Sequence, residues 1–190
     1  ISLTNLPKKE VLRYLGWKGT EIPPALDATI ERCMEETCRL SSPVYIYRRF
    51  SIARETEGIR LLHTPYTLEG ADIAAHLLGC KELYLMCATL GLGIDREIRR
   101  RMLTIPEEAI ILDACATAAI EETADLAETE IAHICKQEGA GITWRFSPGY
   151  GDLPLQTQKW LLPLMDTQRK MGLTLTESLL MTPGKSVSAI

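Results

Sequence analysis

The chain has 190 residues, of which 46% are hydrophobic and 24% charged, and its formal net charge is −4. A chain of this length can bury a sizeable core as a single domain. The acidic balance, with no basic stripe interleaved with aromatic residues, argues against a nucleic-acid-binding protein. No apolar run approaches the roughly 18 residues that a membrane-spanning helix needs, and no signal peptide opens the chain. We therefore expect a globular cytoplasmic protein without membrane contacts.

The cysteines do not form a metal-binding pattern. None of the six belongs to a Cys-x-x-Cys pair, and the three histidines do not cluster near them in the sequence. Zinc sites need such spacing, and we predict no metal. The cysteines are predicted to be mostly buried free thiols in a reducing compartment. They are Cys33, Cys38, Cys80, Cys87, Cys115 and Cys135.

Hydrophobic periodicity divides residues 1–105 into short helices and strands. Helices are predicted at residues 8–15, from the Pro23-Pro24 pair to about residue 40, at 71–78 and at 95–102. Strands are predicted at 44–52, 59–62 and 81–89, and the first two form a hairpin across Glu57-Gly58. The Gly91-x-Gly93 pair lacks the third glycine and the distal acidic residue of a dinucleotide site. Arg99, Arg100 and Arg101 are predicted to form a solvated helix face; the alternative is a site for an anionic partner.

Residues 106–190 contain the longest predicted element, a helix from about Glu107 to Glu138. Its predicted apolar stripe consists of Ile110, Ile111, Ala114, Ala118, Ala119, Leu126, Ile131 and Ile134. A short strand is predicted over residues 141–146, a helix over 157–171 that Pro163 should kink or split, and a final strand over 186–190. That strand ends mid-pattern, and the first residue is not Met, so we expect a sequence trimmed from a longer one. The pattern predicts an α+β fold with a mixed, mostly antiparallel twisted sheet and flanking helices. We treat residues 1–190 as one domain, with parts 1–105 and 106–190 and no clear linker.

The stretch from Trp144 to Pro154 is the first candidate site. Arg145 is followed by Ser147-Pro148-Gly149-Tyr150, which cannot continue a strand or a helix. The arginine offers a planar fork for a carboxylate or phosphate, and the tyrosine offers a ring with a polar tip. A plain tight turn with a surface arginine is the competing interpretation.

A carboxylate pair, Glu121-Glu122, lies in the middle of the long predicted helix. Such a pair normally belongs to a solvated face, but the apolar neighbours of Glu121 would leave it partly buried. A buried carboxylate is costly unless a cation accompanies it. Arg145 and a ligand cation are both candidates for that role.

Two motifs in order carry a resemblance to a known family. Arg145-Phe146-Ser147-Pro148-Gly149-Tyr150 resembles the Arg-x-x-x-Gly-Tyr motif of the activation domain of cobalamin-dependent methionine synthase. The runs at 173–178 and 181–188 are similar to the C-terminal segment of that domain, and the helix from Asp113 fits it in order and spacing. The N-terminal part, with residues 11–16 and 88–91, resembles the standalone relatives of the domain. The resemblance is clear over about the last 80 residues and fainter before them.

The resemblance implies an S-adenosylmethionine-binding protein that supports reductive methylation, and so reactivation, of the cob(II)alamin form of a methionine synthase. Cobalamin would be carried by the partner, a corrinoid-binding synthase lacking its own activation domain, with a flavodoxin-like electron donor. Carried over by position, Arg145 would clamp the ligand carboxylate, and Ser147, Pro148, Gly149 and Tyr150 would cradle the adenosyl part. Glu121 would be the helix carboxylate near the ligand, with Glu122 as its register alternative, and no residue is predicted to be catalytic.

Two other functions remain open from the sequence. The chain could be a non-catalytic module that docks on a corrinoid protein without binding S-adenosylmethionine. It could also be an independent methyltransferase, although no glycine-rich loop follows a first parallel strand and no acidic ribose-binding residue is present, as the usual methyltransferase fold requires. The family also has an aromatic pair beyond the final strand and an N-terminal aspartate, and neither has a counterpart in this sequence.

Overall fold

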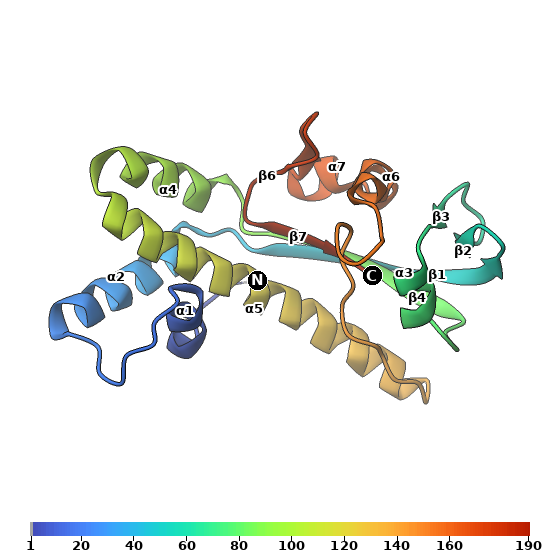
Figure 1. Cartoon of the computed structure of the whole chain (residues 1–190), viewed down its shortest axis with the longest axis horizontal. Helices are drawn as coiled ribbons and strands as arrows, with labels where there is room; N and C mark the ends of the chain where they lie inside the picture. Colours follow the sequence, from blue (N-terminus) through green and yellow to red (C-terminus); the bar gives the residue numbers. More distant parts are fainter. Residues whose placement is uncertain (1) are drawn as a thin grey trace.

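A computed structural model describes residues 2–190 (Figure 1). Its helices are α1 (Lys8–Tyr14), α2 (Pro24–Leu40), α3 (Ala71–His76), α4 (Leu92–Thr104), α5 (Pro106–Gln137), α6 (Gln158–Met165) and α7 (Thr167–Met171), with a 3-10 turn, η1, at Leu155–Thr157. Its strands are β1 (Val44–Glu55), β2 (Gly58–Leu61), β3 (Thr67–Leu68), β4 (Glu82–Thr89), β5 (Thr174–Leu175), β6 (Met181–Thr182) and β7 (Ser186–Ala189).

The main sheet has five strands in the order β3-β2-β1-β4-β7, and every neighbouring pair is antiparallel. The hairpin β1–β2 turns at Glu55↔Gly58, and the last strand, β7, adds to β4 and forms one edge of the sheet. A separate two-stranded pair, β5 and β6, precedes β7. The predicted α+β fold with a mostly antiparallel sheet is confirmed.

Helices cover both faces of the sheet. Alternate residues of β4 point to opposite faces and therefore contact different helices. Leu85 and Cys87 pack in a cluster that includes side chains of α6, whereas Met86 packs with Ala124 and Ala127 of α5. The predicted burial of this strand on both faces is confirmed. The small residues in the middle of α5 allow the helix to lie close against the sheet.

The N-terminal half of α5 packs against α1, α2 and α4, which surround it at one end of the molecule (Figure 1). Four residues of the predicted apolar stripe are buried there, Ile111, Ala114, Ala118 and Ala119, but Ile110 and Leu126 are 56% and 42% exposed. Those two assignments were wrong, because a 3.6-residue period identifies apolar positions without showing which of them a neighbouring element covers.

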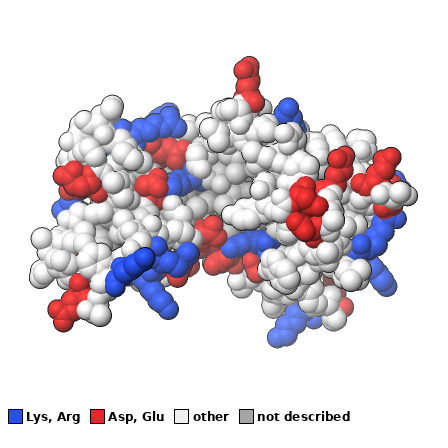
Figure 2. All heavy atoms as spheres, in the orientation of Figure 1, with Lys and Arg blue, Asp and Glu red and all other residues white. Residues whose placement is uncertain are grey.

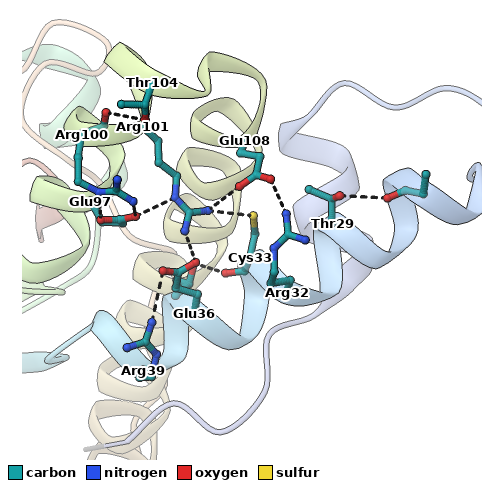
Figure 3. Close-up of polar contacts among 12 residues, drawn as sticks. Thr29, Arg32, Cys33, Glu36, Arg39, Glu97, Arg100, Arg101, Thr104 and Glu108 are labelled. Carbon is teal, nitrogen blue, oxygen red and sulfur yellow. Dashed lines mark hydrogen bonds and ion pairs between the residues drawn. The ribbon is translucent and has the colours of Figure 1, made fainter.

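An ion-pair network joins α2, α4 and α5, and its centre is Arg101 (Figure 3). The Arg101 side chain is 9% exposed; its Nε lies 2.8 Å from Glu97 Oε1, its Nη1 lies 3.1 Å from Glu108 Oε2, and its Nη2 pairs with Glu36. The prediction of a solvated arginine face is therefore wrong for Arg101, although Arg100 remains 62% exposed. The helices α2 and α5 bring two of the carboxylates from outside α4, which the local sequence pattern does not show.

We expect the free energy of unfolding to fall between pH 4.5 and pH 2 partly through Glu97. Hydrogen bonds from Arg100 and then Arg101 lower the pKa of Glu97 from 4.5 to about 2, against the opposing effect of burial. A carboxyl with a depressed pKa stabilises the fold above its unfolded-state pKa, and this stabilisation is lost as pH falls through the folded-state value. Urea unfolding at pH 5, 4 and 3 should show a shallower decline for Glu97→Gln than for the wild type. Parallel declines would show that Glu97 does not contribute.

Two segments near the C-terminus differ from prediction or refine it. Residues 141–146 form no strand, since within this run only Phe146 exchanges two backbone hydrogen bonds, both of 2.9 Å, with Ile190. The predicted helix over 157–171 is split, as expected, into α6 and α7. The break falls at Asp166, whose φ of 57° is left-handed, three residues after Pro163.

The cysteines lie as predicted, as mostly buried free thiols. All six cysteines are free, four of them are buried, and Cys38 and Cys80 are half-buried. Within the described residues no group of side chains is arranged to hold a metal ion, and none of the described helices is long and apolar enough to cross a membrane. On the face drawn in Figure 2, acidic and basic side chains are interspersed.

Candidate functional site

A cavity of about 540 Å³ lies at the β7 edge of the sheet. It is bounded by the middle of α5, the segment that follows residue 143, the start of α6 and strand β7. Five of the six predicted site residues line it. The complete lining is Glu121, Trp144, Arg145, Phe146, Ser147, Pro148, Tyr150, Gln158, Met181, Ser186, Val187 and Ser188. Gly149 does not line the cavity; its φ of 93° closes the turn.

Arg145 is held by three carboxylates from one face of α5. Its Nη2 donates a 3.1 Å hydrogen bond to Glu121 Oε2. Its Nη1 lies 2.7 Å from Asp125 Oδ1 and 3.3 Å from Glu128 Oε2, yet forms a well-directed hydrogen bond with neither oxygen. Arg145, one of the two candidate partners, pairs with Glu121, while Glu122 does not line the cavity.

The charge of this group decides which ligands it favours. One guanidinium and three carboxylates leave Arg145, Glu121, Asp125 and Glu128 with a formal charge of −2. The three carboxylates are 35% to 59% exposed, so water screens them without removing their field. The group therefore favours a ligand that carries positive charge, and the misaligned Nη1 can still turn toward an anionic group on that ligand.

The turn after Arg145 is fixed by backbone hydrogen bonds. Gly149 N–H donates to Leu153 at 2.9 Å, and Tyr150 N–H donates to the Ser147 carbonyl at 3.1 Å. Tyr150 itself is 70% exposed, so its ring lies at the rim of the cavity. The backbone of the turn is thus ordered before any ligand binds.

Trp144 and Phe146, on either side of Arg145, rest on His76 of α3. Their ring centroids lie 4.8 and 5.2 Å from that of His76. Burial lowers the pKa of His76, so the imidazole is neutral at pH 7 and can pack against both aromatic rings. The helix α3 thereby helps to set the direction of the chain on either side of Arg145.

The same turn is anchored to α3 by two aspartates. Asp152 accepts hydrogen bonds from the N–H groups of Ala71 at 2.5 Å and Asp72 at 3.0 Å, and the Asp72 carboxylate accepts one from Asp152 N–H at 3.2 Å. Gly151 has a φ of 52°, and a Cβ there would lie 2.3 Å from Asp72 Oδ2. Asp152 therefore caps α3 from a distant point of the chain and locks the site turn to the helix.

We expect Asp152→Ala to lower the free energy of unfolding by about 1–2 kcal/mol, the usual cost of losing a helix cap. Two backbone N–H groups at the start of α3 would lose their acceptor. Asp152→Asn keeps one acceptor oxygen and should lose less than half of that stability. Urea unfolding followed by circular dichroism provides the measurement. Equal stability of the alanine variant and the wild type would contradict the anchoring role.

Strand β7 is held in place by residues of α4, α5 and β4. Asp95, which is 6% exposed, accepts hydrogen bonds from the N–H groups of Gly184 and, at 3.3 Å, Lys185. Lys185 Nζ lies 2.8 Å from Thr117 Oγ1 and 3.0 Å from Asp113 Oδ1. Ser186 Oγ lies 2.8 Å from Thr89 Oγ1 of β4. These contacts fix the strand that forms one wall of the cavity.

The sequence analysis missed several residues of the cavity and its surroundings. Asp125 and Glu128 follow Glu121 by four and seven positions, and that spacing places all three on one helix face, so the acidic group could have been found from the sequence. Gln158 and Ser188 carry no comparable signal. They meet at the cavity only because α6 and β7 are brought together by the fold.

Part of the chain matches a known family, and most of it shares the fold of a solved structure. Residues 121–190 match the family described as the vitamin B12 dependent methionine synthase activation domain. No curated protein sequence matches the chain significantly. Among solved structures, the MetH reactivation domain bound to AdoHcy is similar, with a TM-score of 0.73 and 17% sequence identity over 97% of this chain and 72% of that chain. At this identity the likeness shows the fold.

The resemblance inferred from the two motifs is confirmed, and the matched segment contains every predicted site residue. Residues 121–190 carry the sequence pattern of the activation domain of vitamin B12-dependent methionine synthase, in a chain that has the fold of the MetH reactivation domain.

Proposed function

We propose that this protein binds S-adenosylmethionine and supports the reductive methylation of the cob(II)alamin form of a cobalamin-dependent methionine synthase. The observation that carries the proposal is the placement of Glu121, Arg145, Ser147, Pro148 and Tyr150 around one cavity within the family-matched segment. The similar MetH reactivation domain is described as bound to AdoHcy, the demethylated product of that ligand.

The cavity suits the size and charge of S-adenosylmethionine. Its volume of about 540 Å³ lies within the range usual for small-molecule sites. The ligand carries a sulfonium, an ammonium and a carboxylate, so its net charge is positive and matches the −2 of the acidic group. In this arrangement Arg145 binds the carboxylate, and Glu121, the one carboxylate of the group that lines the cavity, faces the cationic groups.

In the proposed function, the redox chemistry takes place on the partner protein, and this chain binds the methyl donor. Cobalamin, carried by a corrinoid-binding synthase, would supply the reduced cobalt that accepts the methyl group, with a flavodoxin-like protein as electron donor. Residues of this chain bind the methyl donor, orient its sulfonium toward the open side of the cavity and hold the adenosyl part against the 147–150 turn. The ordered turn supports such orientation because its backbone needs no rearrangement on binding.

Calorimetric titration with S-adenosylmethionine and S-adenosylhomocysteine tests the proposal. We expect micromolar dissociation constants, with the sulfonium bound more tightly than the neutral thioether because of the acidic group. A chain that binds neither compound, yet is retained by an immobilised corrinoid-binding synthase fragment, would support the alternative of a non-catalytic docking module. Glu121→Gln should reduce the difference in affinity between the two ligands, since it removes one negative charge from the cavity wall.

A further inference from the structure

The cavity contains buried polar atoms that the fold leaves without a hydrogen-bond partner. Within the described residues seven buried side-chain nitrogen or oxygen atoms lack a partner, and three of them belong to residues that line this cavity: Arg145 Nη1, Gln158 Oε1 and Ser188 Oγ. Gln158 and Ser188 are 5% and 2% exposed. Such atoms are rare in folded proteins because burying a polar group without a partner is unfavourable. Their concentration at one cavity indicates that a bound ligand supplies the missing hydrogen-bond partners.

Gln158 and Ser188 lie on a different side of the cavity from the acidic group. Ser188 is paired with Cys87 across β7 and β4, and paired residues of neighbouring strands point to the same face. Cys87 packs in the cluster that contains the α6 residues Leu161 and Leu162, whereas the α5 residues Ala124 and Ala127 contact the opposite face through Met86. Ser188 therefore points to the α6 face, where Gln158 begins α6.

The two sides of the cavity differ in the chemistry that they offer. The α5 side presents the charged pair of Glu121 and Arg145, whereas the α6 side presents an amide oxygen and a hydroxyl, both neutral. A carboxamide oxygen accepts hydrogen bonds only, and a serine hydroxyl can donate and accept. A neutral ligand edge with an N–H donor next to an acceptor fits this pair. Charged groups of the ligand would be better placed on the α5 side.

We propose that Gln158 and Ser188 are ligand-binding residues that recognise the adenine edge, with Gln158 Oε1 accepting from the exocyclic amine and Ser188 bonding a ring nitrogen. The inference rests on the proposed function, because the amine belongs to the adenosyl part of the ligand. It places adenine on the α6 side, next to Ser147 and Pro148, which line the same cavity. The methionyl part then extends toward Arg145.

The test compares S-adenosylhomocysteine with S-inosylhomocysteine, in which a carbonyl replaces the amine. Wild-type protein should bind the adenosyl compound at least about tenfold more tightly, since a site that hydrogen-bonds an N–H rejects an analogue without it. Gln158→Leu should bind S-adenosylhomocysteine about tenfold more weakly and lose the preference, because one tenfold step is the usual value of such a bond. Ser188→Ala should weaken the binding of both compounds. Gln156→Leu, an exposed glutamine that does not line the cavity, is the matched control and should change neither affinity.

Thermal unfolding of the free variants separates a binding role from a structural one. Because the Gln158 oxygen and the Ser188 hydroxyl have no protein partner, Gln158→Leu and Ser188→Ala should melt at or above the wild-type temperature. A lower melting temperature with an unchanged adenosyl preference would show a structural role and overturn the inference. Unchanged affinity of both variants would also overturn it, while leaving the proposed function intact. Failure of the wild type to bind S-adenosylhomocysteine at all would instead contradict the proposed function.

Discussion

Replacing Arg101 by methionine is expected to lower the free energy of unfolding by about 3–4 kcal/mol, the usual cost of removing one partner from a buried ion pair. The side chains of Glu36, Glu97 and Glu108 are only 15%, 17% and 21% exposed, so water cannot replace the guanidinium. Without Arg101, the three carboxylates at the junction of α2, α4 and α5 would keep only exposed arginine partners, Arg39, Arg100 and Arg32, and would lose the buried cation between them. Urea unfolding at pH 7, followed by circular dichroism, measures the loss.

Arg100→Met is the matched control for this prediction. Arg100 is the neighbouring residue of α4 and also pairs with Glu97, but its side chain is 62% exposed. Exposed ion pairs contribute between about 0 and 1 kcal/mol, so the control should stay within 1 kcal/mol of the wild type. Arg101→Lys keeps the charge and should fall between the two methionine variants. Equal losses for Arg100→Met and Arg101→Met would contradict the central position of Arg101.

The elements that the sequence predicts well are those whose pattern is local. The long helix α5 has many turns of apolar periodicity, and the β1–β2 hairpin has β-forming residues on both sides of a glycine turn. The stretch at 141–146 has a strand-like composition but forms no strand. Strands need a neighbour, and only Phe146 reaches one, at Ile190. Pairing of that kind depends on distant residues and has no signal in the stretch itself.

Part of the candidate site was predictable for the same reason. The arginine and the glycine turn are adjacent in sequence, and Glu121 lies in the matched helix, so the motif located one wall of the cavity. The wall that contains Gln158 and Ser188 depends on how α6 and β7 meet, which is a tertiary feature. The prediction for Arg101 failed for the same reason, because the burial of this residue depends on distant helices. Arg101 was predicted to be solvated from its neighbours on α4, whereas the carboxylates of α2 and α5 hold it in a buried position.

Arg145→Met is expected to weaken S-adenosylmethionine binding about 100-fold, or about 2.7 kcal/mol, because it removes a charge-assisted contact with the ligand carboxylate. The fold should survive this change better than the Arg101 variant. The carboxylates that Arg145 would leave unpaired are 35% to 59% exposed and can be solvated. Calorimetric titration measures the affinity, and thermal unfolding checks the fold. Arg169→Met, which removes an 80% exposed arginine away from the cavity, controls for the loss of one positive charge.

Decarboxylated S-adenosylmethionine shows whether Arg145 acts on the carboxylate. If the guanidinium binds that group, Arg145→Met should bind the decarboxylated compound at least as tightly as the wild type, because the carboxylate interaction is missing in both and the variant has lost one positive charge beside the cavity. Equal weakening of both compounds in the variant would mean that Arg145 organises the cavity wall through Glu121, Asp125 and Glu128 instead of contacting the ligand. Unchanged affinity for S-adenosylmethionine would show that Arg145 does not contribute to binding and only forms ion pairs with α5. In that case the acidic group, rather than the arginine, would have to select the ligand by its positive charge.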